Sequence, residues 1–272
     1  MRAPGTGLRG ESDLTDKSNS SVSPFVVGVS GHRDLHPEAL QHLRDAVATI
    51  LNQLKGHLPD SELRIMAGMA AGADLLAVQT ALELGFGVDA VLPMPLAQYA
   101  ADFDPETFSL LETLLTHPRI RRRELRAGES CEEADGPAGR ARRDARYATL
   151  TQNLSHGCSL LIALWDGEAS LLPGGTADTV LRFLGVRTDL NKDDDRLHFS
   201  VARPEHDLPE RLVYWIPTAR AKRGVVSLSG APCFLAGLGD NKLQRLSRMS
   251  RRLERYLRLL DAYNREYRRE GF

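Results

Sequence analysis

A repeated pattern constrains the fold of this chain more than any other feature: a short apolar run, a turn of small residues, and an amphipathic segment. The first apolar run, Phe25–Val29, is continuous and rich in β-branched residues, as expected for a strand buried on both faces. Strands that alternate with helices over short connections are typical of parallel sheets. The sequence therefore predicts an α/β fold, namely a Rossmann-like, mostly parallel sheet flanked by helices.

Hydrophobic periodicity extends this pattern along the chain. Further strands are expected over Leu63–Met66, Val88–Leu92, Ser159–Trp165 and Leu212–Ile216. Helices are expected over about Pro37–Leu54, Leu75–Leu84, Asp104–Leu115, Tyr147–Ser155 and Thr179–Leu184. Because parallel sheets bind ligands beyond the carboxyl ends of their strands, the turns that follow the strands hold the candidate binding residues.

Changes in composition divide the chain into three parts. Residues 1–22 are rich in Gly, Ser and charge and lack apolar periodicity, so we expect a disordered leader. Residues 23–230 form the expected ligand-binding domain, with a polar insert over 186–210. Residues 231–272 form an expected C-terminal helical segment. Within it, 241–272 carries ten Lys and Arg against four Asp and Glu and has leucines three or four apart, which predicts a basic amphipathic helix.

The overall composition is that of a globular protein, with 42% hydrophobic and 26% charged residues. The formal net charge is −1, so no global field favours nucleic acid, and we expect no nucleic-acid partner. Three cysteines and no secretion signal indicate reduced thiols and a cytoplasmic location. No apolar run is long enough to span a bilayer. The eight histidines lack metal-ligand spacing, so neither a metal nor a cofactor is expected.

The first candidate site is the turn Ser30-Gly31-His32-Arg33, which follows the first strand. Gly31 permits a close approach of the backbone to a ligand, and Arg33 can hold a phosphate through two parallel hydrogen bonds. The alternative is a tight turn whose Arg pairs with Asp34 or with a helix end. We expect no chemistry from His32.

The second candidate site lies in the turn between residues 67 and 74, where small residues precede a predicted helix. The amide groups and dipole of a helix N-terminus favour a negatively charged ligand. Asp74 could cap the helix or accept a hydrogen bond from a ribose hydroxyl. The alternative is that the small residues only permit close packing of helix on sheet. The candidate binding residues are Gly68, Met69, Gly72, Ala73 and Asp74.

The third candidate site is Gly174-Gly175-Thr176, where two glycines and a hydroxyl again precede a predicted helix. A surface loop is the alternative. Trp165, at the end of a predicted strand, could stack on a base or lie in the core. Taken together, the three turns follow predicted parallel strands, so we expect them to converge on one edge of the sheet.

Five blocks in this order resemble the GHRD-type branch of the SLOG superfamily, which also includes LOG-like phosphoribohydrolases, DprA-like proteins and the nucleotide-sensing regions of TRPM channels. The blocks are VGVSGHRDL from Val27, AGMAAGADLLAVQTALELG from Ala67, AVLPMPLAQYAADF from Ala90, LLIALWDG from Leu160 and GGTADTV from Gly174. The resemblance covers roughly Phe25 to Ile216. It implies a Rossmann-like fold and a sensor of a nucleotide-derived second messenger, such as an ADP-ribose-like or cyclic nucleotide, in bacterial anti-phage defence.

The resemblance also implies which residues bind the ligand. Carried over by position, these are Ser30, Gly31, His32, Arg33, Gly68, Met69, Gly72, Ala73, Asp74, Gly174, Gly175 and Thr176. The enzymatic relatives have a P-G-G-x-G-T-x-x-E motif with a catalytic Glu, and here that position is Leu181. Leu181 cannot exchange protons, which argues against catalysis. Phosphoribohydrolase or NAD-glycohydrolase activity is therefore the alternative function and not the first. Asp178 could substitute, but it lies nearly one helical turn early.

The apolar stripe of residues 241–272 needs a surface to pack on. The protein's own sheet, a second copy of the chain in a homo-oligomer, or an effector or membrane partner would each provide one. The resemblance implies the membrane partner, because related proteins often continue into transmembrane helices after a helix of this kind.

Overall fold

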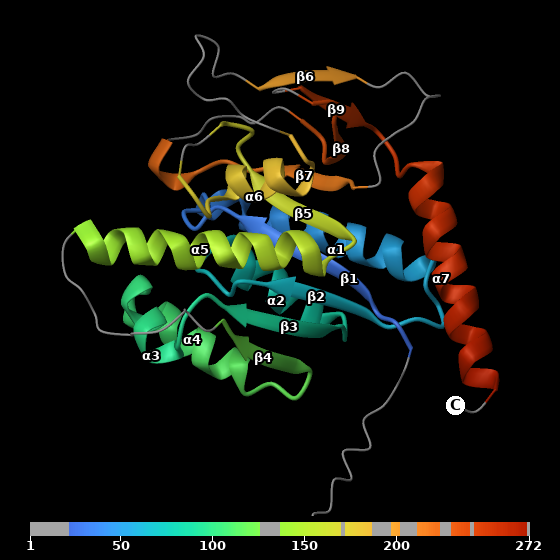
Figure 1. The fold of residues 1–272 in the computed structure, drawn as a ribbon, viewed down its shortest axis with the longest axis horizontal. Helices are drawn as coiled ribbons and strands as arrows, with labels where there is room; N and C mark the ends of the chain where they lie inside the picture. Colours follow the sequence, from blue (N-terminus) through green and yellow to red (C-terminus); the bar gives the residue numbers. More distant parts are fainter. Residues whose placement is uncertain are drawn as a thin grey trace, which may run out of the picture.

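Nine strands form one sheet, in the order β4-β3-β2-β1-β5-β7-β8-β9-β6 (Figure 1). The computed structural model describes residues 22–125, 137–169, 172–186, 197–201, 211–223, 230–239 and 242–270. The strands are β1 (Phe25–Gly31), β2 (Leu63–Ala67), β3 (Gly87–Leu92), β4 (Ile120–Glu124), β5 (Leu160–Trp165), β6 (His198–Val201), β7 (Val213–Pro217), β8 (Cys233–Gly237) and β9 (Lys242–Leu246). The first six strands of this order, from β4 to β7, are mutually parallel, which confirms the predicted fold class.

The helices are α1 (Leu40–Gly56), α2 (Ala73–Glu83), α3 (Leu96–Tyr99), α4 (Pro105–Leu115), α5 (Pro137–Gly157), α6 (Thr176–Phe183) and α7 (Arg251–Arg269). In Figure 1, α5 and α6 lie in front of the sheet, and α1 and α2 lie behind it. Short 3-10 turns at Pro37–Ala39, Ala100–Asp102 and Ala221–Arg223 complete the described elements. The predicted leader, apart from Val22, lies outside the described residues, as does most of the polar insert.

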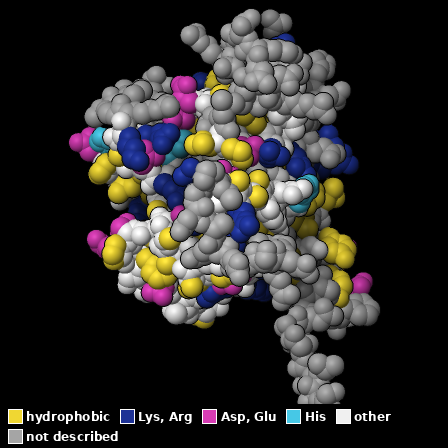
Figure 2. All heavy atoms as spheres, turned by 60° about the vertical axis from the view of Figure 1, so that its left-hand side comes forward, with side chains coloured by type: hydrophobic (Ala, Val, Ile, Leu, Met, Phe, Trp, Pro, Cys, Tyr) yellow, Lys and Arg dark blue, Asp and Glu magenta, His cyan; other side chains and the backbone are white. Residues whose placement is uncertain are grey.

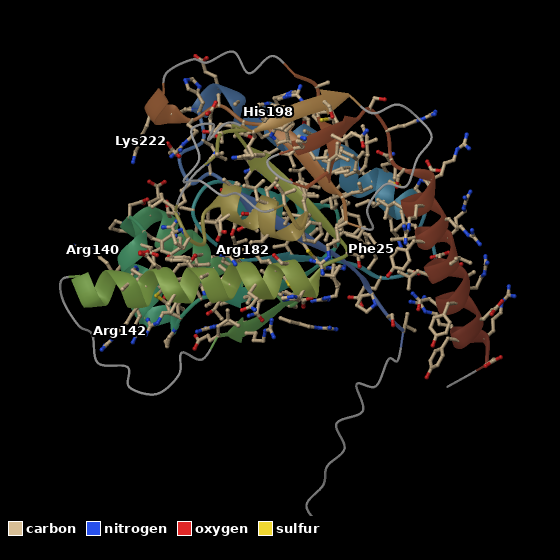
Figure 3. All side chains as sticks on the ribbon, turned by 45° about the horizontal axis from the view of Figure 1, so that its top comes forward. Phe25, Arg140, Arg142, Arg182, His198 and Lys222 are labelled. Carbon is tan, nitrogen blue, oxygen red and sulfur yellow. The ribbon has the colours of Figure 1, made fainter. Side chains whose placement is uncertain are left out.

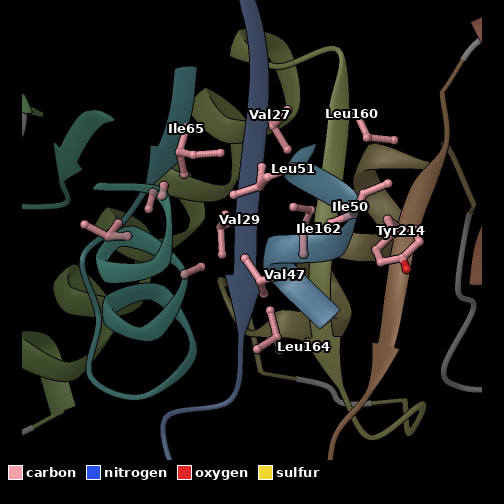
Figure 4. Close-up of a cluster of buried hydrophobic side chains, with 14 of the residues drawn as sticks. Val27, Val29, Val47, Ile50, Leu51, Ile65, Leu160, Ile162, Leu164 and Tyr214 are labelled. Carbon is pink, nitrogen blue, oxygen red and sulfur yellow. The ribbon is translucent and has the colours of Figure 1, made fainter. Parts of the chain in front are cut away.

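Each face of the central strands packs against a different pair of helices. On one face, alternate residues of β1, β2, β5 and β7 meet α1, and Figure 4 shows Val27, Val29 and Ile162 against Val47 and Ile50. On the other face, Trp165 and its neighbours pack against α6, while Leu150 and Leu154 of α5 pack against Met66. Burial of both faces explains why these strands are continuously apolar.

The sheet extends beyond the strands that the sequence predicts. Strand β4 has the sequence IRRRE and was not predicted, because three consecutive arginines give no apolar pattern. The three arginines are exposed, and β4 lies at the edge of the sheet, where charged side chains are common. On the opposite side, β8 pairs antiparallel with both β7 and β9, and β6 pairs parallel with β9. Half of this four-strand region comes from residues 231–246, which the sequence assigns to a helical segment.

The C-terminal helix is therefore shorter than the predicted span of 241–272. Residues 242–246 pair with β8 as strand β9, and α7 starts after Ser250, whose side chain accepts a hydrogen bond from the Leu253 amide. Leu253 and Leu257 belong to the main hydrophobic core, so the helix packs on the protein's own domain. Among the described residues, no helix is both long and apolar enough to cross a membrane.

Polar contacts fix α7 against the loop before β2. Asp261 accepts hydrogen bonds from the Asp60 amide (2.9 Å) and the Ser61 hydroxyl (2.8 Å). Asn264 donates to the Ser23 carbonyl and to the Ser61 hydroxyl, both at 2.9 Å. These contacts join the two ends of the described chain across one end of the sheet.

Replacing Asp261 by alanine is expected to lower the free energy of unfolding by about 2 kcal/mol, because the part-buried Asp60 amide and the buried Ser61 hydroxyl each lose a carboxylate acceptor. Urea denaturation followed by circular dichroism measures the change. Glu266→Ala, on the exposed side of the same helix, is the control and should change stability by less than about 0.5 kcal/mol. An equal effect of the two substitutions would show that the Asp261 contacts contribute nothing.

Candidate functional site

A cavity of about 400 Å³ lies beyond the carboxyl ends of β1 and β5. These two strands are neighbours, but the chain continues from β1 toward β2 on one side and from β5 toward β7 on the other. Such a reversal of strand order is where open parallel sheets bind their ligands. The cavity is lined by parts of the first and third predicted turns, by Asp74, by α5 and by the loop after β7. Figure 3 shows Lys222 of that loop well to the left of Phe25, where β1 begins.

The first predicted turn forms the floor of this cavity. Ser30, Gly31, His32 and Arg33 all line it. A Cβ added to Gly31 would lie 2.3 Å from the Cβ of Ala73 and 2.9 Å from the Leu164 carbonyl oxygen, so the glycine is needed for packing. His32 accepts a hydrogen bond from the Asp166 amide at its Nε2 (3.0 Å), which ties the end of β1 to the end of β5.

Arg33 belongs to a polar cluster with residues of α5 and of the 3-10 turn Ala100–Asp102. Its guanidinium donates to the Tyr147 hydroxyl (2.8 Å) and lies 3.5 Å from the Asp102 carboxylate. Asp102 also pairs with Arg143 and accepts a hydrogen bond from Tyr147. The Arg33 side chain remains 42% exposed, so it can reach a ligand in the cavity while this cluster orients it.

The loop after β7 covers the turn after β1. Arg220 donates to both carboxylate oxygens of Asp34 (2.9 and 3.2 Å), and the Ala221 amide donates to the Asp34 carbonyl. The exposed Lys222 follows in the same loop. Two cationic side chains are thus brought to the cavity from a segment far along the chain from β1.

The second predicted turn is placed differently from the first. Gly72 has φ +79°, and a Cβ there would lie 2.3 Å from the Arg33 carbonyl oxygen. The Ala73 amide donates to the His32 carbonyl, so this helix N-terminus caps the β1 turn. Gly68 accepts from the Tyr99 hydroxyl through its carbonyl, and Met69, with φ 60°, is buried. Gly68, Met69, Gly72 and Ala73 are absent from the described cavity lining and shape the turn behind it.

Asp74 is the one residue of the second turn's predicted set that lines the cavity. It is only 6% exposed, and its Oδ2 accepts a hydrogen bond from the Ala70 amide (3.2 Å). Burial raises the pKa of the Asp74 carboxyl to about 7, although the Ala70 amide and the Arg33 charge act in the opposite direction. Asp74 can therefore exist as a neutral acid or as a carboxylate near neutral pH.

The third predicted turn forms another wall. Gly174 (φ +75°) packs against the Tyr147 backbone of α5, and Gly175 is the N-cap of α6. Gly174, Gly175 and Thr176 line the cavity, so the positive end of the α6 dipole faces it. The Asp178 carboxylate accepts from the Gly174 amide (2.8 Å) and pairs with Arg182 (2.6 Å). These contacts leave the Asp178 carboxylate engaged within its own helix and turn.

Trp165 borders the cavity but is completely buried. Its indole nitrogen donates to the Glu168 carbonyl (3.0 Å), and its ring contacts Phe199 and Trp215. The side chain thus forms part of the core beneath the cavity.

Sequence reasoning misses several residues at this site, chiefly Tyr147, Asp102, Arg220 and Lys222. The sequence pattern places Tyr147 in a helix but in no site, and Asp102 is part of the third resemblance block. Arg220 carries no local motif, and only its long-range pairing with Asp34 brings it to the site. Among the residues that the structure describes, no group of three or more His, Cys, Asp or Glu side chains is arranged to hold a metal ion.

A scan against family models and a search of curated proteins find no match for this chain. Similar solved structures include DNA processing protein A (DprA) from Streptococcus pneumoniae, with 17% identity, a TM-score of 0.39 and coverage of 66% of this chain and 51% of that one. DprA from Helicobacter pylori has 16% identity, a TM-score of 0.35 and 66% coverage of each chain. The structural-genomics target TM1055 has 15% identity, a TM-score of 0.33 and coverage of 59% of this chain and 69% of that one.

These similarities concern the fold alone, and the chain spans about half the length of the Streptococcus pneumoniae protein. They correct one expectation. The Helicobacter pylori structure is titled for its single-stranded DNA binding mode, so the exclusion of nucleic acid as a partner was wrong. A net charge near zero is a poor basis for such an exclusion, because it conceals local groups of like charge. On the face shown in Figure 2, clusters of Lys and Arg side chains lie among Asp and Glu side chains.

Proposed function

We propose that this chain binds a nucleotide-derived ligand in the cavity beyond β1 and β5. The observation that carries the proposal is the position of that cavity at the reversal of strand order, with the first and third predicted turns on its walls. The resemblance to the SLOG superfamily supports the same class of ligand. An ADP-ribose-like or cyclic nucleotide suits a cavity of about 400 Å³, which falls in the usual size range of small-molecule sites.

The ligand's phosphates are assigned to the side of the cavity formed by α6, Arg33 and Lys222. The first turn of α6 offers backbone amides and the positive end of a helix dipole. Arg33 is already oriented by Tyr147 and Asp102, so little side-chain entropy is lost when it meets a phosphate. The base and ribose then occupy the rest of the cavity.

In this proposal the chain acts as the sensor domain of a bacterial anti-phage system, as the resemblance implies. The signal would reach an effector through segments that contact the cavity. The hydrolase alternative lacks a supporting observation at Asp178, because that carboxylate is held by Gly174 and Arg182. The proposed sensor binds its ligand without breaking a bond in it.

A ligand that binds only the folded state raises its stability, by about 2.7 kcal/mol at a concentration one hundred times Kd. We expect ADP-ribose or a cyclic dinucleotide, tested in a thermal-shift panel, to raise the Tm by several degrees. Arg33→Met should weaken the affinity at least tenfold, because the phosphate loses a charge-assisted pair. Isothermal titration calorimetry measures the affinity directly.

Arg182→Met is the matched control, since Arg182 lies on α6 but pairs with Asp178 and is absent from the described cavity lining. Its affinity should equal that of the unmodified chain. Failure of every nucleotide in the panel to shift the Tm at millimolar concentration would overturn the proposal. Chromatography of the same samples tests the alternative, because release of free base from NAD or AMP would identify a hydrolase.

A further inference from the structure

The charges around the cavity are poorly matched to an anionic ligand. Carboxylates outnumber cationic side chains in the described lining, which contains Asp34, Asp74, Asp166 and Glu168 against Arg33, Arg220 and Lys222. Arg220 is further committed to Asp34, with Asp166 3.9 Å away. With all four carboxylates ionised, the charged side chains of the described lining sum to −1, and this excess negative charge opposes the binding of an anion.

Asp74 is a buried carboxyl group of this lining whose charge is readily removed. Asp34 is held by the Arg220 guanidinium, which also lies 3.9 Å from the Asp166 carboxylate. Glu168 is exposed to water, which stabilises its charge. Asp74 is buried and bonded at one oxygen by the neutral Ala70 amide. Its pKa is raised to about 7 by this burial.

Groups from three other elements lie near Asp74 and influence whether its carboxyl group is ionised. Arg33, from the turn after β1, favours the carboxylate. Tyr99, on α3, interacts electrostatically with Asp74, and also with Asp102 and Arg143. Tyr147 of α5 lines the same cavity. Because a phosphate bound to Arg33 offsets part of the Arg33 charge, it removes part of what favours an ionised Asp74.

We propose that Asp74 enters the ligand complex as the neutral acid and donates a hydrogen bond to an oxygen of the ligand, so that the anion and one proton bind together. This inference rests on the proposed function and adds the chemistry of recognition: the ligand presents an acceptor oxygen, of a phosphate or a ribose, to Asp74. Binding is then strongest at slightly acidic pH, and Asp74 selects ligands that have such an oxygen.

Calorimetry with ADP-ribose tests the inference, because ADP-ribose has no group that titrates between pH 6 and pH 8. Titrations at pH 8 in two buffers with different ionisation enthalpies give the number of protons exchanged. We expect the uptake of about one proton, and an affinity about tenfold weaker at pH 8 than at pH 6. Asp74→Asn, whose amide also donates, should bind with an affinity independent of pH and take up no proton.

Asp144→Asn, on the exposed side of α5, is the control and should behave like the unmodified chain. Binding without proton uptake would overturn the inference and leave the proposed function standing. Proton uptake that persists in Asp74→Asn would assign the proton to another group, such as His32, and would equally overturn it. The absence of any ADP-ribose binding, with none by a cyclic dinucleotide, would overturn both proposals.

Discussion

Replacing Gly72 by alanine is expected to lower the free energy of unfolding by about 4 kcal/mol, a large part of the stability of an ordinary domain. Two costs combine. The backbone at Gly72 has φ +79°, which an alanine adopts with strain. The new Cβ would also lie 2.3 Å from the Arg33 carbonyl oxygen and 2.7 Å from the His32 carbonyl oxygen. Both are backbone atoms, so relief requires the β1 turn to move.

Gly85 provides a matched control for this substitution. Its φ is +81°, nearly that of Gly72, but nothing lies within 4 Å of an added Cβ. Gly85→Ala should therefore cost only the backbone strain, about 1 to 2 kcal/mol. Urea denaturation of the two variants shows how much more stability is lost at Gly72, where the contacts and a ψ of −115° add to the positive φ. If both variants lose the same stability, the close packing of Gly72 on the β1 turn is incorrect.

The parallel part of the sheet was predictable because its strands are buried on both faces. Their sequences are continuously apolar, and that pattern needs no knowledge of the neighbouring strands. Strand β9 was not predictable in this way. In KLQRL the two leucines are three residues apart, a spacing that also fits a helix, and the choice is made by pairing with β8. Strand β4 carries no apolar pattern because it lies at the sheet edge.

The site shows the same division between local and long-range information. The glycine turns were predictable because a run of small residues after an apolar run can be recognised from the local sequence alone. What each glycine meets was not predictable: Gly31 and Gly72 make room for other parts of the chain. The cluster around Arg33 was missed because Tyr147 lies 114 residues away, and the pairing of Asp34 with Arg220 spans 186 residues.

Replacing Asp74 by asparagine is expected to stabilise the protein at alkaline pH. Burial raises the pKa of the folded Asp74 carboxyl from 3.8 to about 7, so the folded state holds the proton more tightly than the unfolded state. The protein therefore loses stability as the pH rises from about 4 to about 7. Above pH 7 the full cost applies, about 4 kcal/mol at most. Asparagine keeps the shape of the neutral acid and does not ionise.

The stability gained by Asp74→Asn should consequently grow by about 2 to 3 kcal/mol between pH 5 and pH 8. Urea denaturation of the free protein at both pH values measures this difference without any ligand. Asp144→Asn removes an exposed carboxylate and should show no comparable change. A constant difference between Asp74→Asn and the unmodified chain would mean that Arg33 fully compensates the buried charge. In that case Asp74 would bind its ligand as a carboxylate, and the cavity would favour hydroxyl donors over phosphate oxygens.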